Sequence, residues 1–192
     1  MYTQDQLMHL FEDKNVLLKG HFVLTSGLHS DRYAQCARIF EYPEVAQLIC
    51  GELVEKLAGT DIDLVMGAAI GGITMAYEIA RELGVPNIFA EREDGKLTLR
   101  RGFTIPEGAK VLIVEDVITT ASTVNEMLPL VEEAGAEVSA VACILDRTNG
   151  DVHFKVPFVS ELAVKVLNYE AGACPLCEEG SVAVEPGSRH LH

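Results

Sequence analysis

The chain has 192 residues, of which 48% are hydrophobic and 23% are charged, so it can bury the core of one globular domain. Its formal net charge of −14 repels nucleic acid and anionic lipid, which argues against a partner of either kind. No apolar run approaches the roughly 20 residues that span a bilayer, and no secretory signal opens the sequence, so we expect a cytoplasmic protein.

Helices and strands are predicted to alternate along the chain. In chain order the pattern predicts helices at 3–14 and 43–57, a strand at 62–67, a helix at 73–84, strands at 87–91 and 111–116, a helix at 124–135, and strands at 137–146 and 162–167. Gly84 is the expected stop of one helix, and Ser122 or Thr123 the expected cap of another. The alternation indicates an α/β fold with an open, mostly parallel sheet flanked by helices.

Three segments that carry chemically useful groups follow predicted strands. These segments are Gly67–Gly72, Glu115–Thr123 and Asp146–Arg147. Ligands of open parallel sheets bind beyond the carboxyl ends of the strands. We therefore expect the three segments to meet at one edge of the sheet.

An acid pair ends the most apolar strand. Glu115 and Asp116 directly follow the run 111–114, and a loop rich in hydroxyl groups comes next, with Thr119, Thr120, Ser122 and Thr123. Two carboxylates suit the vicinal hydroxyls of a ribose, or Mg²⁺. The N–H groups at the start of the following helix suit a terminal phosphate. This pattern favours a sugar phosphate as ligand, over an ordinary polar strand end with a helix cap.

A glycine-rich turn, GAAIGGIT at 67–74, connects the first predicted strand to its helix. Its backbone N–H groups suit a phosphate. Ile73 stands where the phosphate loop of ATPases has a lysine, which argues against an ATPase. The alternative is a tight turn whose glycines serve geometry alone.

A basic segment lies between the strand at 87–91 and the strand at 111–116. It contains Arg92, Lys96, Arg100 and Arg101, with Asp94 and Gly95 as a predicted hairpin tip. The alternative is a solvated hairpin of mixed charge, because Glu91, Glu93 and Asp94 dilute the basic groups.

The strand, acid pair and hydroxyl loop together resemble the type I phosphoribosyltransferases, which use 5-phosphoribosyl-1-pyrophosphate (PRPP). FVLTSGLHSDRYAQCA at 22–37 and LDR at 145–147 resemble the members of that family that act on orotate. The resemblance implies transfer of the phosphoribosyl group to orotate, which gives orotidine 5′-phosphate and pyrophosphate. It also implies Mg²⁺ as cofactor, a homodimer with shared active sites, and one domain over 1–192, with a hood from 1–40, a core at 62–170 and a tail at 171–192.

The resemblance also implies roles for individual residues. PRPP would be bound by Gly67, Ala68, Ala69, Ile70, Gly71, Gly72, Arg92, Lys96, Glu115, Asp116, Val117, Ile118, Thr119, Thr120, Ala121, Ser122 and Thr123. Asp116 and Lys96 would be the catalytic residues, and Asp116 would also hold the metal through water. Thr119 and Arg147 would bind orotate, the arginine through a bidentate contact with the carboxylate.

The sequence departs from the family pattern at positions that bear on individual PRPP contacts, and two alternative functions of the same fold remain. Thr25 replaces a common lysine, Ala121 replaces a common glycine, and the basic segment lacks the usual histidine. An alanine at 121 predicts a negative φ there. The alternatives are an enzyme for purine bases, to which Arg147 would be of no use, and a PRPP-sensing regulator, for which the acidic chain offers no basic surface.

The five cysteines are Cys36, Cys50, Cys143, Cys174 and Cys177. We expect reduced thiols, because their number is odd and no signal peptide is seen. Cys174 and Cys177 form one CxxC, which lacks the second CxxC that a four-cysteine zinc site needs. Two inert thiols are therefore the favoured interpretation, ahead of a zinc site completed by His190 and His192.

Overall fold

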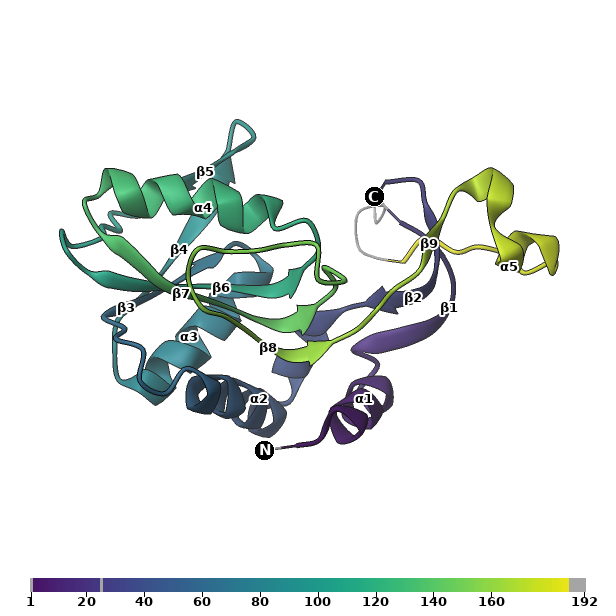
Figure 1. Cartoon of the computed structure of the whole chain (residues 1–192), viewed down its shortest axis with the longest axis horizontal. Helices are drawn as coiled ribbons and strands as arrows, with labels where there is room; N and C mark the ends of the chain where they lie inside the picture. The colour runs from purple at the N-terminus through teal and green to yellow at the C-terminus, as the bar shows by residue number, and fades with distance from the viewer. Residues whose placement is uncertain (1, 25, 187–192) are drawn as a thin grey trace.

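Two sheets organise the fold (Figure 1), and the computed structural model describes them within residues 2–24 and 26–186. In these ranges the central sheet has six strands in the order β5-β4-β3-β6-β7-β8. Their bounds are Leu64–Ala68 (β3), Asn87–Glu93 (β4), Lys96–Leu99 (β5), Lys110–Ile118 (β6), Glu137–Asp146 (β7) and Phe158–Ala163 (β8). Neighbours from β4 to β8 pair in parallel, and β5 is antiparallel to β4. The predicted mostly parallel sheet is confirmed.

Helices cover both faces of the central sheet. Helices α2 (Pro43–Lys56) and α3 (Gly71–Leu83) lie on one face, and α4 (Ser122–Glu133) lies on the other (Figure 1). The most apolar strand, β6, serves both layers: Leu112 and Val114 join the cluster with α2 and α3, while Val111 and Ile113 join the cluster with α4. Side chains alternate between the faces of a strand, so burial of both faces requires the unbroken apolar run.

A smaller sheet stands beside the carboxyl ends of the central strands. It comprises β1 (Leu17–Val23), β2 (His29–Ala34) and β9 (Asn168–Tyr169), all antiparallel. Helix α1 (Gln4–Asp13) precedes it, and the 3-10 helix η1 (Cys36–Glu41) links it to α2. The arrowheads of β6, β7 and β8 point toward this sheet (Figure 1). Most of this small sheet, called the hood below, comes from residues 1–40, and β9 adds a strand from a later part of the chain.

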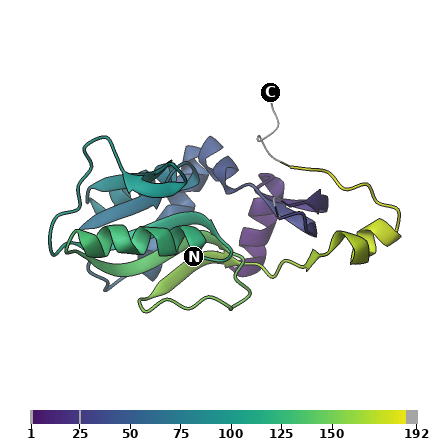
Figure 2. The ribbon, with the colours of Figure 1, turned by 90° about the horizontal axis from the view of Figure 1, so that it is seen from above.

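The chain after β9 lies beyond the small sheet, on the side away from the central sheet (Figure 2). This tail contains the 3-10 helix η2 (Ala171–Ala173) and the short helix α5 (Pro175–Glu178). It returns at Val184, which exchanges backbone hydrogen bonds with β1: Val184 N–H donates to His21 O, and Val23 N–H donates to Val184 O, each at 2.9 Å. Thr25, His190 and His192 lie outside the described residues.

Most predicted elements match the observed ones within a few residues. The predicted strand at 162–167 is wrong, because β8 runs from Phe158 to Ala163. Its signal was hidden by Glu161, which is fully buried and accepts a 2.7 Å hydrogen bond from Lys56 Nζ. An ion pair to another element thus permits a charged residue in a buried strand. None of the described helices is long and apolar enough to cross a membrane.

Candidate active site

The three segments selected from the sequence do meet at the carboxyl edge of the central sheet. Strands β3, β6 and β7 are neighbours, and each ends at one of the segments. A backbone hydrogen bond from Arg147 N–H to Ile118 O, 2.9 Å long, joins the ends of β7 and β6 directly. Neighbouring parallel strands therefore collect groups from residues 67 to 147 in one place.

The two acids lie on opposite faces of β6. Asp116 contacts Gly71 at the start of α3, whereas Glu115 accepts a hydrogen bond from the Thr123 side chain at the start of α4. Burial raises the pKa of Glu115 to about 7, and burial also raises the pKa of Asp116. Within the described residues neither acid forms an ion pair. Only the more distant charge of Arg92 acts on Glu115, so two partly buried carboxylates without an ion-pair partner are costly, and a bound cation or hydroxyl donors would relieve the cost.

The glycine-rich turn allows a close approach between β3, α3 and β6. A Cβ atom on Gly67 would lie 2.3 Å from Gly72 O, and one on Gly71 would lie 2.5 Å from Asp116 Oδ2. Only glycine fits either position without displacement of a neighbour. The Ala69–Ile70 peptide bond between them is cis. As a result, the Asp116 carboxylate lies against the amino end of α3, where no side chain caps the helix.

The hydroxyl-rich loop presents the amino end of a second helix at the same edge. Thr119, Thr120 and Ser122 are exposed, and Ala121 is buried. The predicted cap at Ser122 or Thr123 is wrong, because Ala121 occupies the N-cap position and no side chain caps α4. The first N–H groups of α4 are therefore without a capping side chain, which makes this end a suitable site for an anion.

Ala121 also corrects the expected backbone conformation of this loop. Its φ is +58° and its ψ is 19°, which is left-handed rather than the predicted negative φ. Strand β6 delivers the chain to the sheet edge, and α4 must pack back along the face, so the turn between them adopts this conformation despite the alanine. The strain is local, since a non-glycine residue in this region costs roughly 1 kcal/mol.

Arg147 has an unsatisfied group at the other end of the site. Its side chain is partly buried, and its Nε has no hydrogen-bond partner within the described residues. Burial lowers the pKa of the Arg147 guanidinium. The charges of Arg147 and Asp116 both act on the Cys36 thiol, where Asp116 raises the pKa and Arg147 lowers it. A buried guanidinium without a counter-ion is a strong site for a planar anion.

Two hood residues near Arg147 had no role assigned from the sequence. Tyr33 on β2 and the buried Cys36 on η1 are the groups that act electrostatically on Arg147. They belong to 22–37, the segment whose resemblance pointed to orotate, so a signal was present although no single residue stood out. Residues from the segment 22–37 therefore lie close enough to Arg147 to act on its charge.

The basic segment forms the predicted hairpin, but its Arg92 and Arg101 side chains are bound to glutamates of the protein. Asp94 and Gly95 are the tip, with φ of +50° and +83°. Arg92 donates to both carboxylate oxygens of Glu126 on α4, at 2.9 Å each, and Arg101 is similarly bound to Glu91. Lys96 is exposed, and the described residues show neither an ion pair for it nor a contact with the acids. The structure therefore does not bring Lys96 to the acid pair.

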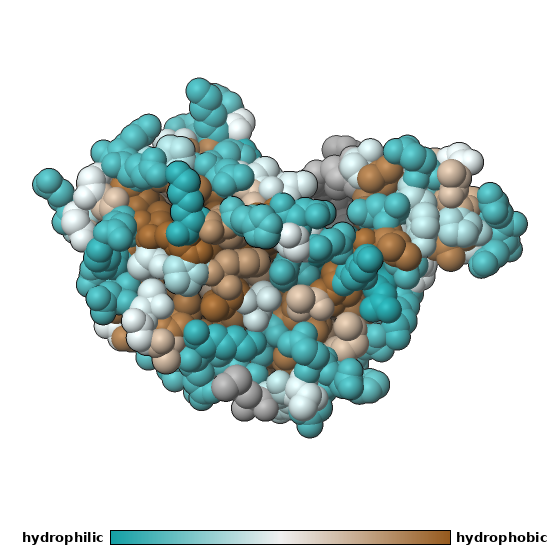
Figure 3. Space-filling model, viewed as in Figure 1, coloured by the Kyte–Doolittle hydropathy of each residue, from teal (hydrophilic) through white to brown (hydrophobic). Residues whose placement is uncertain are grey.

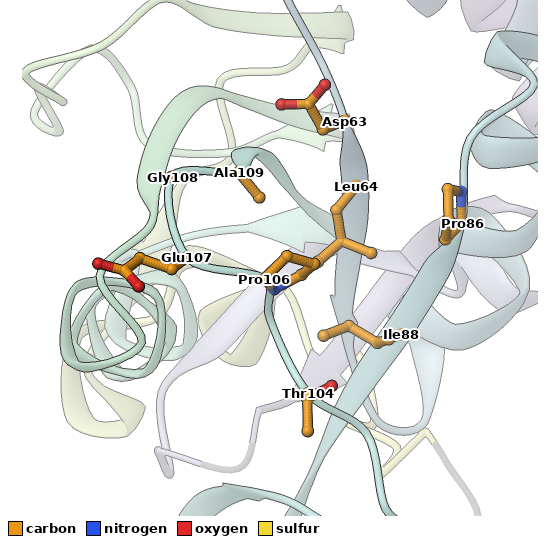
Figure 4. A pocket seen from close by; sticks show the side chains of 9 residues that line it. All are labelled: Asp63, Leu64, Pro86, Ile88, Thr104, Pro106, Glu107, Gly108 and Ala109. Atoms are coloured by element: carbon orange, nitrogen blue, oxygen red, sulfur yellow. The ribbon is translucent and has the colours of Figure 1, made fainter.

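Two hollows in the surface differ in their relation to this edge. One, of about 570 Å³, is lined by Asp146, residues 149–151 and residues 163–165, next to Arg147. The other, of about 370 Å³, lies at the amino ends of β3 and β6, where Leu64, Ile88 and Pro106 line it (Figure 4). The second hollow is at the wrong edge for a ligand site in an open parallel sheet.

Comparison with known proteins identifies relatives over nearly the whole chain. The phosphoribosyl transferase domain family matches residues 39–160. An orotate phosphoribosyltransferase of Caldanaerobacter subterraneus is 50% identical over 188 residues, which are 98% of this chain and 99% of that protein.

Solved structures show the same fold. Orotate phosphoribosyltransferase from Aeropyrum pernix superposes with a TM-score of 0.70 at 25% identity, covering 82% of this chain and 93% of that one. An adenine phosphoribosyltransferase from Thermoanaerobacter pseudethanolicus has a TM-score of 0.63 at 18% identity, over 69% of this chain and 88% of that one. The second likeness concerns the fold alone.

Proposed function

Because the chain belongs to the orotate phosphoribosyltransferases, within the phosphoribosyl transferase domain family, we propose that it transfers the phosphoribosyl group of PRPP to orotate. A ring nitrogen of orotate forms a bond to the anomeric carbon of the ribose, and the bond from that carbon to pyrophosphate breaks. The products are orotidine 5′-phosphate and pyrophosphate, which places the reaction in pyrimidine biosynthesis. The observation that carries the proposal is the unpaired acid pair between the amino ends of two helices.

The sugar phosphate occupies the space beyond β6. Glu115 and Asp116 accept hydrogen bonds from the ribose hydroxyls, which replaces the solvent that burial removes from these carboxylates. The 5′-phosphate binds the N–H groups of the loop 117–123 and the start of α4, whose hydroxyl side chains are exposed. The geometry that supports this arrangement is the short connection between the acids and that helix end.

The pyrophosphate lies near the turn 67–72. The uncapped amino end of α3 offers N–H groups to its oxygens, and Asp116 is in contact with the same turn. Carboxylate oxygens suit Mg²⁺, so Asp116 would hold the ion through water. When bound, Mg²⁺ neutralises charge on the leaving group. Lys96 and Arg92 supply further positive charge once the hairpin moves, which for Arg92 requires release from Glu126.

Arg147 binds the carboxylate of orotate, and Thr119 contacts the same base. The partnerless Nε supports this role, because orotate supplies the anion that the described residues do not. Orotate is already anionic, so positioning of its ring nitrogen matters more than a general base. Tyr33 and Cys36, whose charges act on Arg147, lie on the hood side of the same site.

Orotate absorbance, followed with PRPP and Mg²⁺ present and then with each omitted, tests the reaction. We expect consumption of orotate only in the complete mixture. A second mixture offers orotate together with adenine and hypoxanthine. Preferential consumption of a purine would show that the acceptor is a purine base and not orotate. Binding of PRPP without turnover of any base would indicate a regulator instead of an enzyme.

A homodimer with shared active sites completes the proposal, in the cytoplasm and without nucleic acid or membrane partners. Ile70, directly before α3, and Tyr77 within α3 support it, because these hydrophobic side chains are 85% and 59% exposed. Hydrophobic residues also appear among hydrophilic ones on the face seen in Figure 3. Light scattering of the purified protein gives its mass directly, and a monomer under assay conditions would contradict the shared site.

A further inference from the structure

Four side chains that could bind a metal converge where the tail meets the hood. They are His21 on β1, His29 at the start of β2, and Cys174 and Cys177 around α5. Their ligand atoms all lie within 4.8 Å of one another. The histidines are about 150 residues from the cysteines in the sequence, so the fold alone brings the two pairs together.

The spacing of these atoms is close to that of a tetrahedral zinc site. With Zn–S near 2.3 Å and Zn–N near 2.05 Å, tetrahedral geometry separates a sulfur from a nitrogen by about 3.6 Å. The observed separations are 3.5 Å from Cys174 Sγ to His21 Nε2, 3.8 Å from Cys177 Sγ to His21 Nε2, and 3.4 Å from Cys177 Sγ to His29 Nδ1. The two ring nitrogens are 2.8 Å apart and need to separate by about half an ångström.

His21 is already oriented for such a role. Its side chain is 5% exposed, and its Nδ1 donates a hydrogen bond to the backbone oxygen of Ser181 at 3.1 Å. That bond places the proton on Nδ1 and leaves the Nε2 lone pair directed at the cysteines. Metal-binding histidines characteristically donate their second nitrogen to a carbonyl or carboxylate in this way.

The tail buries few side chains that could fix it to the rest of the protein. Between residues 171 and 186, Cys174 is the sole buried residue, and Val182 and Val184 are 82% and 52% exposed. Small segments that cannot bury an apolar core are commonly held by a metal or disulfide. The structure contains no disulfide at these cysteines.

We propose that His21, His29, Cys174 and Cys177 form a structural zinc site that fastens the tail to the hood hairpin. Two thiolates and two imidazoles are a ligand set that zinc favours, and four protein ligands leave no open position for catalysis. The site replaces the interpretation of the CxxC as two inert thiols, and it uses His21 and His29 in place of His190 and His192. It does not depend on the proposed reaction, because metal content is measured without substrate.

The primary test is the metal content of untagged protein, expressed with zinc in the medium and measured by mass spectrometry. We expect about one zinc per chain in the unmodified protein and nearly none in Cys177→Ser or His21→Ala. Cys177 is exposed, so its replacement by serine removes no packed side chain from the core, and loss of zinc in this variant reports on the missing ligand. His153→Ala is the matched control, because His153 is an exposed histidine away from the cluster, and it should retain the metal.

Cobalt substitution tests the ligands themselves. Co²⁺ in the cluster should give the visible bands of a tetrahedral ion and a near-ultraviolet thiolate band, both lost in Cys177→Ser and kept in His153→Ala. Chelation should also expose residues 168–186 to protease. Protein without bound metal, a Cys174–Cys177 disulfide in the purified chain, or full zinc content in His21→Ala would each overturn the proposal.

Discussion

Replacement of Gly71 by alanine tests the link between the glycine-rich turn and the acid pair. The new Cβ would lie 2.5 Å from Asp116 Oδ2 and 2.6 Å from Asp116 Cγ, whereas ordinary van der Waals contact begins at 3.4 Å. The carboxylate must therefore move by about 0.9 Å. Since misplacement by about 1 Å can cost a factor of roughly 100 in rate, we expect kcat/KM to fall about 100-fold.

The fold should tolerate the same substitution. The clashing atoms belong to the far end of a side chain that can rotate, and φ at Gly71 is not left-handed. Loss of glycine flexibility in the unfolded chain stabilises by about 0.4–1 kcal/mol, which offsets the cost of the displacement. Gly71→Ala should therefore keep a free energy of unfolding within about 1 kcal/mol of the parent. Thermal unfolding by circular dichroism and orotate consumption, measured on the same samples, separate the two effects.

Gly51→Ala is the matched control for this prediction. Gly51 lies within α2, and a Cβ there meets nothing within 4 Å. It should gain up to about 1 kcal/mol of stability and keep full activity. The reasoning would be refuted if Gly71→Ala were fully active, or if its activity fell only in proportion to the fraction of unfolded protein.

Four further changes probe the same edge of the sheet. Asp116→Asn should lower turnover more than PRPP affinity, and the reverse pattern in initial-rate kinetics would contradict its catalytic role. Arg147→Ala should raise the KM for orotate and leave that for PRPP nearly unchanged; equal losses for both substrates would count against it. Ala121→Gly should change the free energy of unfolding by less than about 0.5 kcal/mol, because relief of the positive φ offsets the roughly 1 kcal/mol that glycine normally costs through the unfolded chain, and a loss of about 1 kcal/mol or more would show that the loop is not strained. Burial raises the pKa of Glu115 in the folded chain to about 7, above the ordinary value of about 4.5, so the folded state binds the extra proton and its stability falls as pH rises from about 4.5 to 7. Glu115→Gln should therefore gain stability relative to the parent across that window and hold a constant gain above it; denaturant titrations that show no pH-dependent difference would refute the shift.

The residues at the carboxyl edge of the central sheet could be predicted because each follows a recognisable strand in the sequence. Glu115 and Asp116 follow an apolar strand, the hydroxyl loop follows them, and Arg147 follows the neighbouring strand, so the parallel sheet alone places them together. This prediction required only that the strands be parallel neighbours, and it did not require the positions of individual side chains. A pattern within about ten residues, combined with one fold rule, was sufficient.

Other features depend on contacts that no local pattern contains. Arg92 was expected at the phosphates, yet it binds Glu126, 34 residues away on α4. The left-handed Ala121 arises from how β6 and α4 must connect, and alanine gives no sign of it. Cys174 meets His21 across 153 residues, a contact that the CxxC pattern does not reveal.

The return of Val184 to β1 has a consequence for the order in which the protein assembles during synthesis. Residues 17–34 leave the ribosome long before Asn168, Tyr169 and Val184, which complete the same sheet. The six strands of the larger sheet lie between these points, so they are all available for pairing first. The hairpin of β1 and β2 therefore lacks its partners at both edges until residues 168–184 have been synthesised.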